Sequence, residues 1–486
     1  MIKLRTRLER LLTRHNNLVS IILSMVGIVV TVLIALSEKF SGTDYVRTIV
    51  ILIPIVCFFL LCRLSMHKYR SNYLSTISGK QYYAWQLKAM EKLYGAKSLT
   101  KAFGEVYSAK TIQFDSVRSV LDEDTVSLLK SGNIKNQVKN HGIVKKMFPG
   151  WKNAVTRLEY RLIVESSIKF EVPGYILDRY SFDKRTIYCK MGMYRQNIYT
   201  SNILEFELYK AFMRLKKSAL NSNIPVPDNL LDFLPMRKLI HRKCNYDLNT
   251  ILMTGTGRFS LLSVQLMIVY RSSKDNKYKT LIKKRSGKGL TSKLNYLQFV
   301  PSGGFDMCET ERNIFNIKKM EVGCNLETVV WREFLEELFN QKNFQGVYDD
   351  PGNTDPENKI YGSNQMKLIE RLRKEGKARF KVLGSVIDLN NLRHNISYLL
   401  HVTDEAGEFE REIINNIDFN NEFTYDSESW ESLIDLQKLD DMKGYEESRM
   451  ITSESAGLYH LFSEYREQQK REKEPKKEGK ITITIL

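Results

Sequence analysis

The 486-residue sequence contains few cysteines, and their spacing excludes two common kinds of scaffold. None of its six cysteines forms a Cys-x-x-Cys pair: Cys57 and Cys62 lie in an apolar run, and the other four stand far apart. A disulfide-stapled fold and a structural zinc site are therefore not expected, and free thiols favour a reducing compartment. The seven histidines are equally scattered. We expect structural roles for His394 and His401, which fall in strand-like surroundings.

Repeats and nucleic-acid-binding signatures are also absent from the sequence. No internal repeat occurs at the periods of solenoid proteins, and compositional bias is confined to the charged segment 470–480. The aromatic and basic residues follow no known nucleic-acid-binding motif, so nucleic acid is not the expected partner. A composition of 43% apolar and 27% charged residues is that of a globular protein. At roughly 150 residues per domain, the chain has room for two or three domains.

Acidic residues are too few to balance the basic ones, which leaves a formal net charge of +18. Most of this excess lies in the segment 65–244, which has 31 Lys and Arg against 15 Asp and Glu. Such an excess indicates an acidic partner and says nothing about fold. Three interpretations stay open: a solvated basic face beside anionic lipid, a phosphate-bearing ligand, or nucleic acid.

Two long apolar runs near the N-terminus predict a transmembrane hairpin. The run from Leu18 to Leu36 has no charged residue and is close to the ~20 residues that a membrane-spanning helix needs. The run 48–62 is shorter and contains Pro54. A cleaved signal peptide is the alternative for the first run, but that run is longer than a typical signal core. Basic residues on both outer flanks predict a multi-pass membrane protein with both termini in the cytoplasm.

We divide the chain into four parts, which predict an α/β protein with a membrane anchor. These are the transmembrane hairpin (1–64), a basic mixed α/β region that is a lid or accessory domain and can contact anionic lipid (65–250), a second α/β domain (254–469) and a charged, disordered tail (470–486). In the basic region we expect helices at 82–90, 116–129 and 204–220 and strands within 157–172 and 175–199. In the second domain we expect strands at 261–270, 278–286, 296–300, 380–389 and 395–402, and a closing helix at 453–468.

The segment 332–337 (Arg-Glu-Phe-Leu-Glu-Glu) carries the strongest chemical signal. At about 100° per residue, Glu333, Glu336 and Glu337 share one face of a helix. Three carboxylates on one face repel one another unless a divalent cation lies between them, and oxygen ligands of this kind suit Mg²⁺ or Mn²⁺. Arg332 stands one turn before Glu336 and can orient it. The opposite side is apolar and is predicted to pack on a core: Trp331, Phe334, Leu335 and Leu338.

Upstream residues add features that phosphate chemistry needs. Gly303 and Gly304 follow a strand, and paired glycines allow the backbone to bend tightly and approach a ligand. The stretch 271–293 holds nine basic residues and one acidic residue, and within it Arg285 is a candidate phosphate contact. Metal-bound carboxylates beside a basic edge suit hydrolysis of a phosphoanhydride, in which a carboxylate accepts a proton from water.

With these residues, the segment 254–469 resembles the Nudix hydrolase superfamily. The box of that family runs Gly, five residues, Glu, seven residues, and then Arg-Glu-apolar-x-Glu-Glu-x-Gly-apolar. Gly304 matches the first glycine, and 332–337 match the core of the box. The resemblance implies an α/β/α sandwich with a mixed sheet, Mg²⁺ or Mn²⁺ bound by Glu333, Glu336 and Glu337, a nucleotide-type small molecule as ligand, and a homodimer.

The sequence departs from the box at two positions and in one spacing. Cys324 stands in place of the first glutamate, although Gly323 keeps the preceding glycine, and Phe339 replaces the final glycine. About nineteen residues separate Gly304 from Cys324 where the family has five. This insertion supplies three acidic residues that are candidates to replace the missing carboxylate: Glu309, Glu311 and Glu321.

Three functions follow from this sequence. The first is a membrane-anchored hydrolase that cleaves the phosphoanhydride of a nucleoside diphosphate linked to another group. The second is a non-catalytic nucleotide sensor that signals to the transmembrane hairpin. The third is a scaffold whose basic region docks on lipid or a partner. The three retained glutamates favour the enzyme, whereas Cys324 and the insertion favour the sensor.

Overall fold

A computed structural model of the chain describes residues 71–77, 79–131, 173–219, 224–284, 296–306, 317–339, 360–419, 433–441 and 451–473. The chain divides into two compact units, Met1–Ser75 and Thr76–Leu486. Every helix and strand named below belongs to the second unit.

The membrane-anchored architecture is corrected by the structure. Across the described ranges, no helix is long and apolar enough to cross a membrane. The longest helix described there, α19 (Ser453–Lys473), has charged side chains along its length, and such side chains are costly in hydrocarbon. The structure of the described residues therefore contradicts the predictions of a transmembrane hairpin and of a multi-pass location with cytoplasmic termini. The two predicted spans, 18–36 and 48–62, lie outside the described residues.

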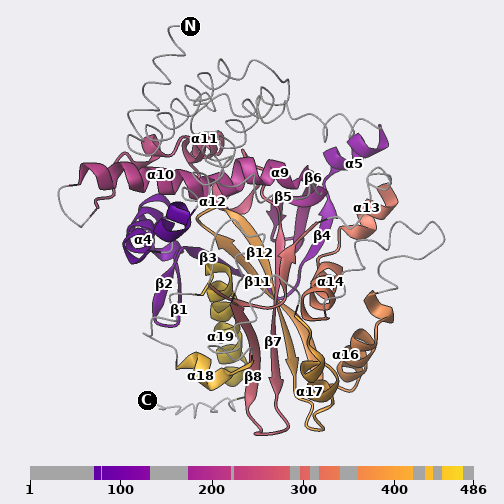
Figure 1. Cartoon of the computed structure of the whole chain (residues 1–486). Coiled ribbons are helices and arrows are strands. Elements are labelled where there is room, and N and C mark those ends of the chain that lie inside the picture. Colours follow the sequence, from indigo (N-terminus) through magenta and orange to yellow (C-terminus); the bar gives the residue numbers. More distant parts are fainter. Residues whose placement is uncertain are drawn as a thin grey trace, which may run out of the picture. The chain divides into compact units, whose positions relative to one another are not determined.

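A mixed sheet of eight strands forms the centre of the second unit, which agrees with the predicted α/β class (Figure 1). Its order is β13 (Leu433–Asp435), β8 (Tyr278–Lys284), β7 (Ser263–Arg271), β12 (Arg393–Val402), β11 (Ala378–Asp388) and β3 (Ala109–Gln113), with β10 (Ser302–Gly304) beside β7 and β9 (Leu297–Phe299) beside β8. Strands β7 and β12 run parallel. The other neighbouring pairs are antiparallel. The strands predicted at 261–270, 278–286, 296–300, 380–389 and 395–402 are confirmed as β7, β8, β9, β11 and β12.

Strand β7 is buried on both faces, because successive side chains of a strand point in opposite directions. Leu266 and Ile268 join the core on one side of the sheet. Met267 and Val269 join the core on the other side. This two-sided burial explains why the sequence of β7 is a continuous apolar run rather than an alternating one.

Helices α14 (Leu326–Phe339) and α16 (Asn364–Lys374) cover the first face of the sheet. The Trp331 ring lies 4.5 Å from the ring of Phe380 on β11, measured between centroids. The side of α14 that was predicted to pack on a core is fully buried: Trp331, Phe334, Leu335 and Leu338. Burial of this side turns the opposite side, which carries the glutamates, toward β10.

Helix α19 covers the second face and confirms the predicted closing helix, although it extends past residue 468 to Lys473. A Cβ atom at Gly457 would lie 2.4 Å from Cγ1 of Val386, so this glycine lets the helix approach β11 closely. The hydroxyl of Ser455 accepts hydrogen bonds from Nε2 of Gln265 (2.6 Å) and from the amide of Phe299 (3.1 Å). These bonds fasten the start of α19 to β7 and β9.

A second sheet of three strands has the order β4 (Arg118–Leu121), β6 (Thr186–Met193), β5 (Pro173–Ser181). The edge of β5 that does not pair with β6 is hydrogen-bonded to segments next to β7 and β10. The Tyr175 amide donates to the Phe305 carbonyl (2.9 Å), and the Leu177 amide donates to the Ser260 carbonyl (3.0 Å). The helix predicted at 116–129 is wrong in its first part, because 118–121 pair in parallel with β6. Strands were predicted in 175–199, where β5 and β6 are found; the segment 157–172 lies outside the described residues.

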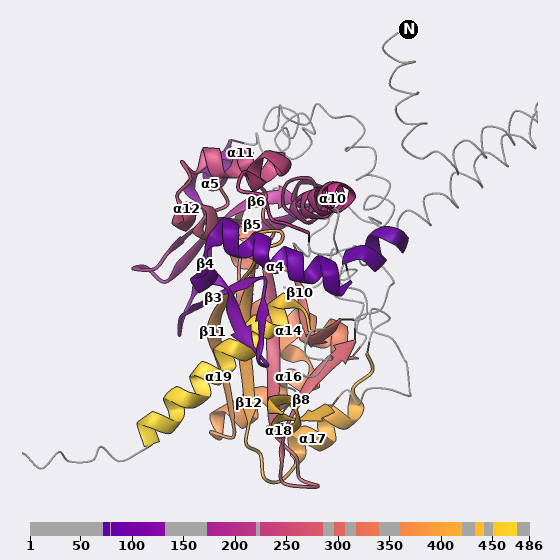
Figure 2. The same cartoon turned by 90° about the vertical axis from the view of Figure 1, so that its left-hand side faces the viewer.

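Four helices pack together beyond one end of the main sheet (Figure 2): α4 (Lys80–Tyr94), α10 (Ile203–Ser218), α11 (Pro235–Lys243) and α12 (Leu248–Met253). The predicted helices at 82–90 and 204–220 correspond to α4 and α10. The ring of Phe212 on α10 lies edge-on against Tyr82 (5.2 Å) and Trp85 (5.6 Å) of α4. The shorter helices and the remaining hairpin are α5 (Glu123–Lys130), α9 (Tyr194–Asn197), α13 (Ile317–Gly323), α17 (Glu408–Glu412), α18 (Leu436–Asp440), β1 (Thr100–Ala102) and β2 (Glu105–Tyr107).

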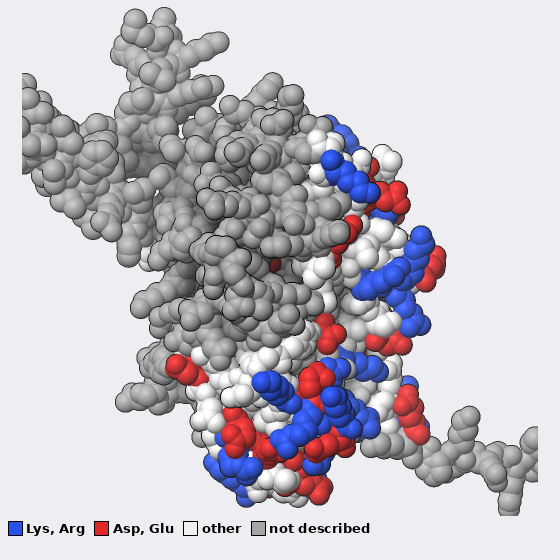
Figure 3. Space-filling view, turned by 90° about the vertical axis from the view of Figure 1, so that its right-hand side faces the viewer, with Lys and Arg blue, Asp and Glu red and all other residues white. Residues whose placement is uncertain are grey.

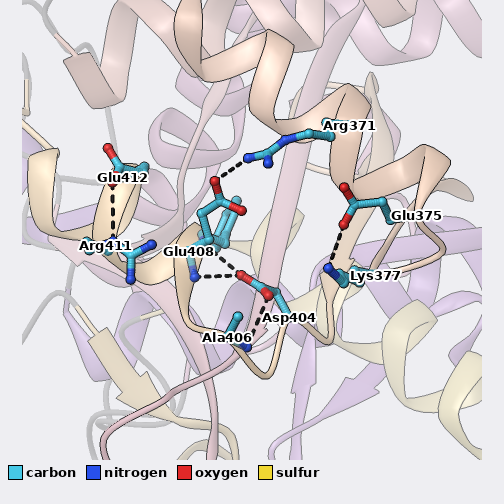
Figure 4. Close-up of polar contacts among 9 residues, drawn as sticks. Arg371, Glu375, Lys377, Asp404, Ala406, Glu408, Arg411 and Glu412 are labelled. Atoms are coloured by element: carbon cyan, nitrogen blue, oxygen red, sulfur yellow. Dashed lines mark hydrogen bonds and ion pairs between the residues drawn. The ribbon is translucent and has the colours of Figure 1, made fainter.

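The short helix α17 is fixed at its start by one carboxylate (Figure 4). Asp404 accepts hydrogen bonds from the amides of Ala406 (3.2 Å), Glu408 (2.6 Å) and Phe409 (3.0 Å). A carboxylate at this position satisfies amides that have no partner within the helix. Arg371 of α16 pairs with Glu408, so α16 and α17 are also linked by an ion pair.

Candidate functional site

The carboxylates of α14 face the glycine turn that follows β9. Glu337 is buried, and its Oε2 accepts a hydrogen bond from the Ser302 amide (2.8 Å). The carboxylate of Glu333 lies over Gly303, where an added Cβ atom would stand only 2.0 Å from Cδ of Glu333. Of the three glutamates, Glu336 keeps the most exposed side chain, at 18%. Position 303 therefore has to be glycine, because the Glu333 carboxylate occupies the space of a side chain there.

Arg332 joins the helix to this turn. Its Nη2 donates to the Gly304 carbonyl (3.1 Å) and to Oε1 of Glu333 (2.7 Å), and its Nη1 donates to the Asp306 carbonyl (3.0 Å). Its Nε stands 4.0 Å from Oε1 of Glu336. The guanidinium therefore lies between two of the predicted metal ligands, and it contacts Glu333 more closely than Glu336.

Asp306 is a carboxylate of this site that the sequence did not reveal. Its Oδ1 is buried, and no group in the described part of the chain donates a hydrogen bond to it. Burial raises the pKa of Asp306 to about 6; Arg332 opposes this shift and Glu333 adds to it. Its position two residues after Gly304 is the only sequence signal, since its approach to Arg332 depends on how the turn folds.

Within the described residues, no acidic residue of the insertion is found beside the carboxylates of α14. Glu321 lies on α13 and is exposed, while Glu309 and Glu311 lie outside the described residues. None of the three is therefore placed in the site by the structure. Asp306, which precedes most of the insertion, is the additional carboxylate that the described residues bring to Arg332 and Glu333.

Cys324 occupies a packing position just before α14. It is 3% exposed, and burial together with the neighbouring Cys324 thiol raises the pKa of Cys189 on β6. The Cys324 carbonyl accepts a hydrogen bond from Ser119 of β4 (2.7 Å). At Gly323, an added Cβ atom would stand 2.8 Å from the hydroxyl of Tyr175. The three-stranded sheet thus packs directly on the start of α14, where a thiol fits and a charged carboxylate does not.

Phe339, in place of the final glycine of the box, is also a packing residue. It is partly buried against the core, and its ring centroid lies 5.5 Å from that of Phe334. The aromatic side chain therefore extends the apolar side of α14 by one residue.

The basic stretch 271–293 is partly neutralised where the structure describes it. Three of its basic residues form ion pairs with acidic residues: Arg271 with Glu405, Lys277 with Asp435, and Lys279 with Asp275. Figure 3 shows basic and acidic side chains interspersed over the described part of one face. Arg285, the candidate phosphate contact, lies outside the described residues.

The metal prediction can be compared with the donors present. Within the described ranges, no group of three or more His, Cys, Asp or Glu side chains is arranged to hold a metal ion. Carboxylate oxygens are the donors that a hard divalent cation prefers, and one Asp306 oxygen has no hydrogen-bond donor among the described residues, while Glu333 and Glu336 lie against the guanidinium of Arg332.

The chain matches no protein-family model, no curated protein and no solved structure. Its function is therefore inferred from the residues and geometry of this site.

Proposed function

We propose that the second unit is a Nudix-type hydrolase that cleaves the phosphoanhydride of a nucleoside diphosphate linked to another group. The supporting observation is that Arg332 of α14 donates hydrogen bonds to the backbone carbonyls of Gly304 and Asp306. These bonds hold the three glutamates of α14 and the carboxylate of Asp306 around one glycine turn. The resemblance of 332–337 to the Nudix box is consistent with this arrangement.

Each residue of the site has a role in this proposal. Glu333, Glu336 and Glu337 would hold Mg²⁺ or Mn²⁺, which when bound would offset the charge of the phosphates and activate water. Glu336 is the most exposed of the three and is the group best placed to accept a proton from water. Arg332 orients Glu333 through a 2.7 Å contact. Gly303 keeps the turn free of a side chain that would displace Glu333.

The test is turnover of a nucleotide panel by the full chain with and without Mg²⁺. The panel contains NADH, ADP-ribose, a nucleotide sugar and a dinucleoside polyphosphate. We expect Mg²⁺-dependent release of a nucleoside monophosphate from at least one compound. The double variant Glu336→Gln, Glu337→Gln should lower kcat by at least ~10²-fold, as removal of general-base and metal chemistry does. Glu412→Gln, an exposed change on α17, is the matched control.

A binding module is the second candidate, and two observations favour it. The described carboxylates are not grouped for a metal, and the box position at Cys324 is used for packing against Cys189. A binding module would bind a nucleotide of the panel without Mg²⁺-dependent turnover. Turnover that persists in the double glutamine variant would instead disprove the assignment of the site.

A further inference from the structure

Arg258 is a buried arginine whose charge has no counterpart in the described part of the chain. It directly follows the turn Thr254-Gly255-Thr256-Gly257 after α12 and is 3% exposed. All three guanidinium nitrogens are buried, and none has a hydrogen-bond partner within the described residues. A buried guanidinium without partners is strongly unfavourable, and arginine side chains in protein interiors are normally paired with anions.

The groups around Arg258 do not supply this anion. The ionisable groups whose charges couple to that of Arg258 are Tyr94, Cys244, Arg237, His241 and His394, and none of them is a carboxylate. The pKa of Arg258 is lowered to about 10, mainly by burial and also by the positive charge of Arg237, while Tyr94 and Cys244 act in the opposite direction. The guanidinium is nevertheless still protonated at neutral pH.

Arg237 brings a second buried guanidinium to the same place. It is fully buried on α11, and its two terminal nitrogens donate to the Tyr94 hydroxyl and to the Asn390 carbonyl. Glu207, which accepts the amides of Met236 and Arg237, is the carboxylate that acts on this group. Burial raises the pKa of Glu207 to about 8, so this carboxylate does not offset two guanidinium charges at neutral pH.

His241 completes the cluster. It stands four residues after Arg237 and therefore on the same face of α11. It is 4% exposed, and its Nε2 is buried without a hydrogen-bond partner among the described residues. Burial, together with Arg237 and Arg258, lowers the pKa of His241 to about 4. A neutral imidazole at this position can donate one hydrogen bond to an oxygen atom.

We propose that Arg258, Arg237 and His241 form a binding site for a small oxyanion of the phosphate class. A tetrahedral oxyanion accepts two hydrogen bonds from one guanidinium and offsets the charge of both. The cluster lies directly beneath the surface: Lys243 and Thr256 are exposed, and a Cβ atom at Gly257 would stand 3.2 Å from Cδ of Lys243.

This site is distinct from the carboxylate site of α14. It is built by α4, α11 and the turn before β7, and none of these elements supplies a side chain to the glutamate cluster. In Figure 1, α11 and α12 lie above the main sheet, next to α10. The two sites also differ in sign, because one gathers carboxylates and the other gathers guanidinium groups.

The test is thermal unfolding of the full chain in inorganic phosphate, compared with chloride at the same ionic strength. We expect the Tm of the wild type to rise in a saturable manner with phosphate, because a ligand bound only by the folded state stabilises it. Arg258→Met should remove this rise. Without phosphate, this variant should melt no lower than the wild type, since an unpaired buried charge is removed. Arg242→Met, an exposed change on the same helix, should keep the full rise.

Calorimetric titration of phosphate provides the second measurement. It uses the conservative variant Arg258→Lys, so that the test still applies if Arg258→Met does not fold. Arg258→Lys keeps the charge and loses the two-pronged geometry, so phosphate binding should weaken at least tenfold. Acetate in place of phosphate distinguishes a planar carboxylate from a tetrahedral oxyanion. The proposal is overturned if the wild type shows no saturable response or if Arg258→Met or Arg258→Lys binds phosphate as the wild type does. It is also overturned if acetate replaces phosphate fully, or if Glu336→Gln abolishes the response while Arg258→Met does not.

Discussion

At Gly303 the carboxylate of Glu333 fills the space that a side chain would need. An added Cβ atom would lie 2.0 to 2.3 Å from the Glu333 carboxylate atoms. Gly303→Ala should therefore push Glu333 away from the turn and lower the free energy of unfolding by about 1–3 kcal/mol, as overpacking does elsewhere. Chemical denaturation measures this change. Gly362→Ala is the matched control, because among the described residues no atom beyond its chain neighbours lies within 4 Å of its added Cβ. An equal effect of the two substitutions would contradict the close contact.

The buried carboxylate of Glu207 makes stability depend on pH. Burial raises its pKa from 4.5 to about 8, so the folded chain holds its proton more tightly than the unfolded chain. The stability that Glu207 contributes is fully present below about pH 4.5 and is lost as pH rises through about 8. At roughly 1.36 kcal/mol per unit of pKa shift, this loss is at most about 5 kcal/mol.

Glu207→Gln should remove this pH dependence. The measurement is the free energy of unfolding in urea for the wild type and the variant between pH 5 and pH 9. We expect the wild type to lose stability relative to the variant as pH rises, whatever the cost of the amide at neutral pH. A difference between the two chains that stays constant over this range would refute the raised pKa.

Among the elements, α19 and β11 depend on one another through a glycine. An added methyl group at Gly457 would stand 2.4 Å from Cγ1 and 2.7 Å from Cγ2 of Val386. Gly457→Ala should thus lower the free energy of unfolding by about 1–3 kcal/mol. In the double variant Gly457→Ala, Val386→Ala, the removed valine methyl groups make room for the new one. The loss in the double variant should be smaller than the sum of the two single losses, and strict additivity would show that the contact is not the cause.

The elements that the sequence predicted are those whose signal is local. Strand β7 is a continuous apolar run, and α14 has an apolar side and an acidic side at helical spacing. Strands β3 and β4 were missed because they are short and are defined by partners far along the chain. Residues 118–121 pair with 186–189, and β3 pairs with β11. No local pattern specifies such a partner, and 118–121 were assigned to a helix for that reason.

The candidate site was predictable to the same extent. Helical spacing places Glu333, Glu336 and Glu337 on one side of α14, and that placement follows from the sequence alone. The position of Asp306 does not, since it is set by the hydrogen bonds of Arg332 to the carbonyls of the turn. Arg258 was not predicted to be a site residue for a different reason. An arginine is normally exposed, and only the packing of α4 and α11 around it shows that it is buried.

At the scale of the whole second unit, Asn390 connects elements that are distant in sequence. Its side-chain amide donates to the hydroxyl of Ser108 beside β3 (2.7 Å), and its backbone amide donates to Asp388 (3.1 Å). Its side-chain oxygen accepts from Gln86 on α4, and its carbonyl accepts from Arg237 on α11. Asn390 is 3% exposed, and its side-chain amide also donates to the buried carboxylate of Asp388 (2.8 Å), so three partners lose a hydrogen bond without this side chain.

Asn390→Ala should therefore destabilise more than one element. The three lost side-chain hydrogen bonds predict a decrease of about 1.5–4.5 kcal/mol in the free energy of unfolding, at about 0.5–1.5 kcal/mol for each bond. Asn416→Ala is the control, since the side chain of this exposed asparagine donates to the nearby backbone carbonyls of Arg411 and Glu412. Hydrogen exchange should rise together in peptides from α4 and from the segment around β3, because both lose a bond to the same side chain. Exchange that rises in β3 while α4 stays as protected as in the wild type would mean that Asn390 holds a single strand and does not couple the helices to the sheet.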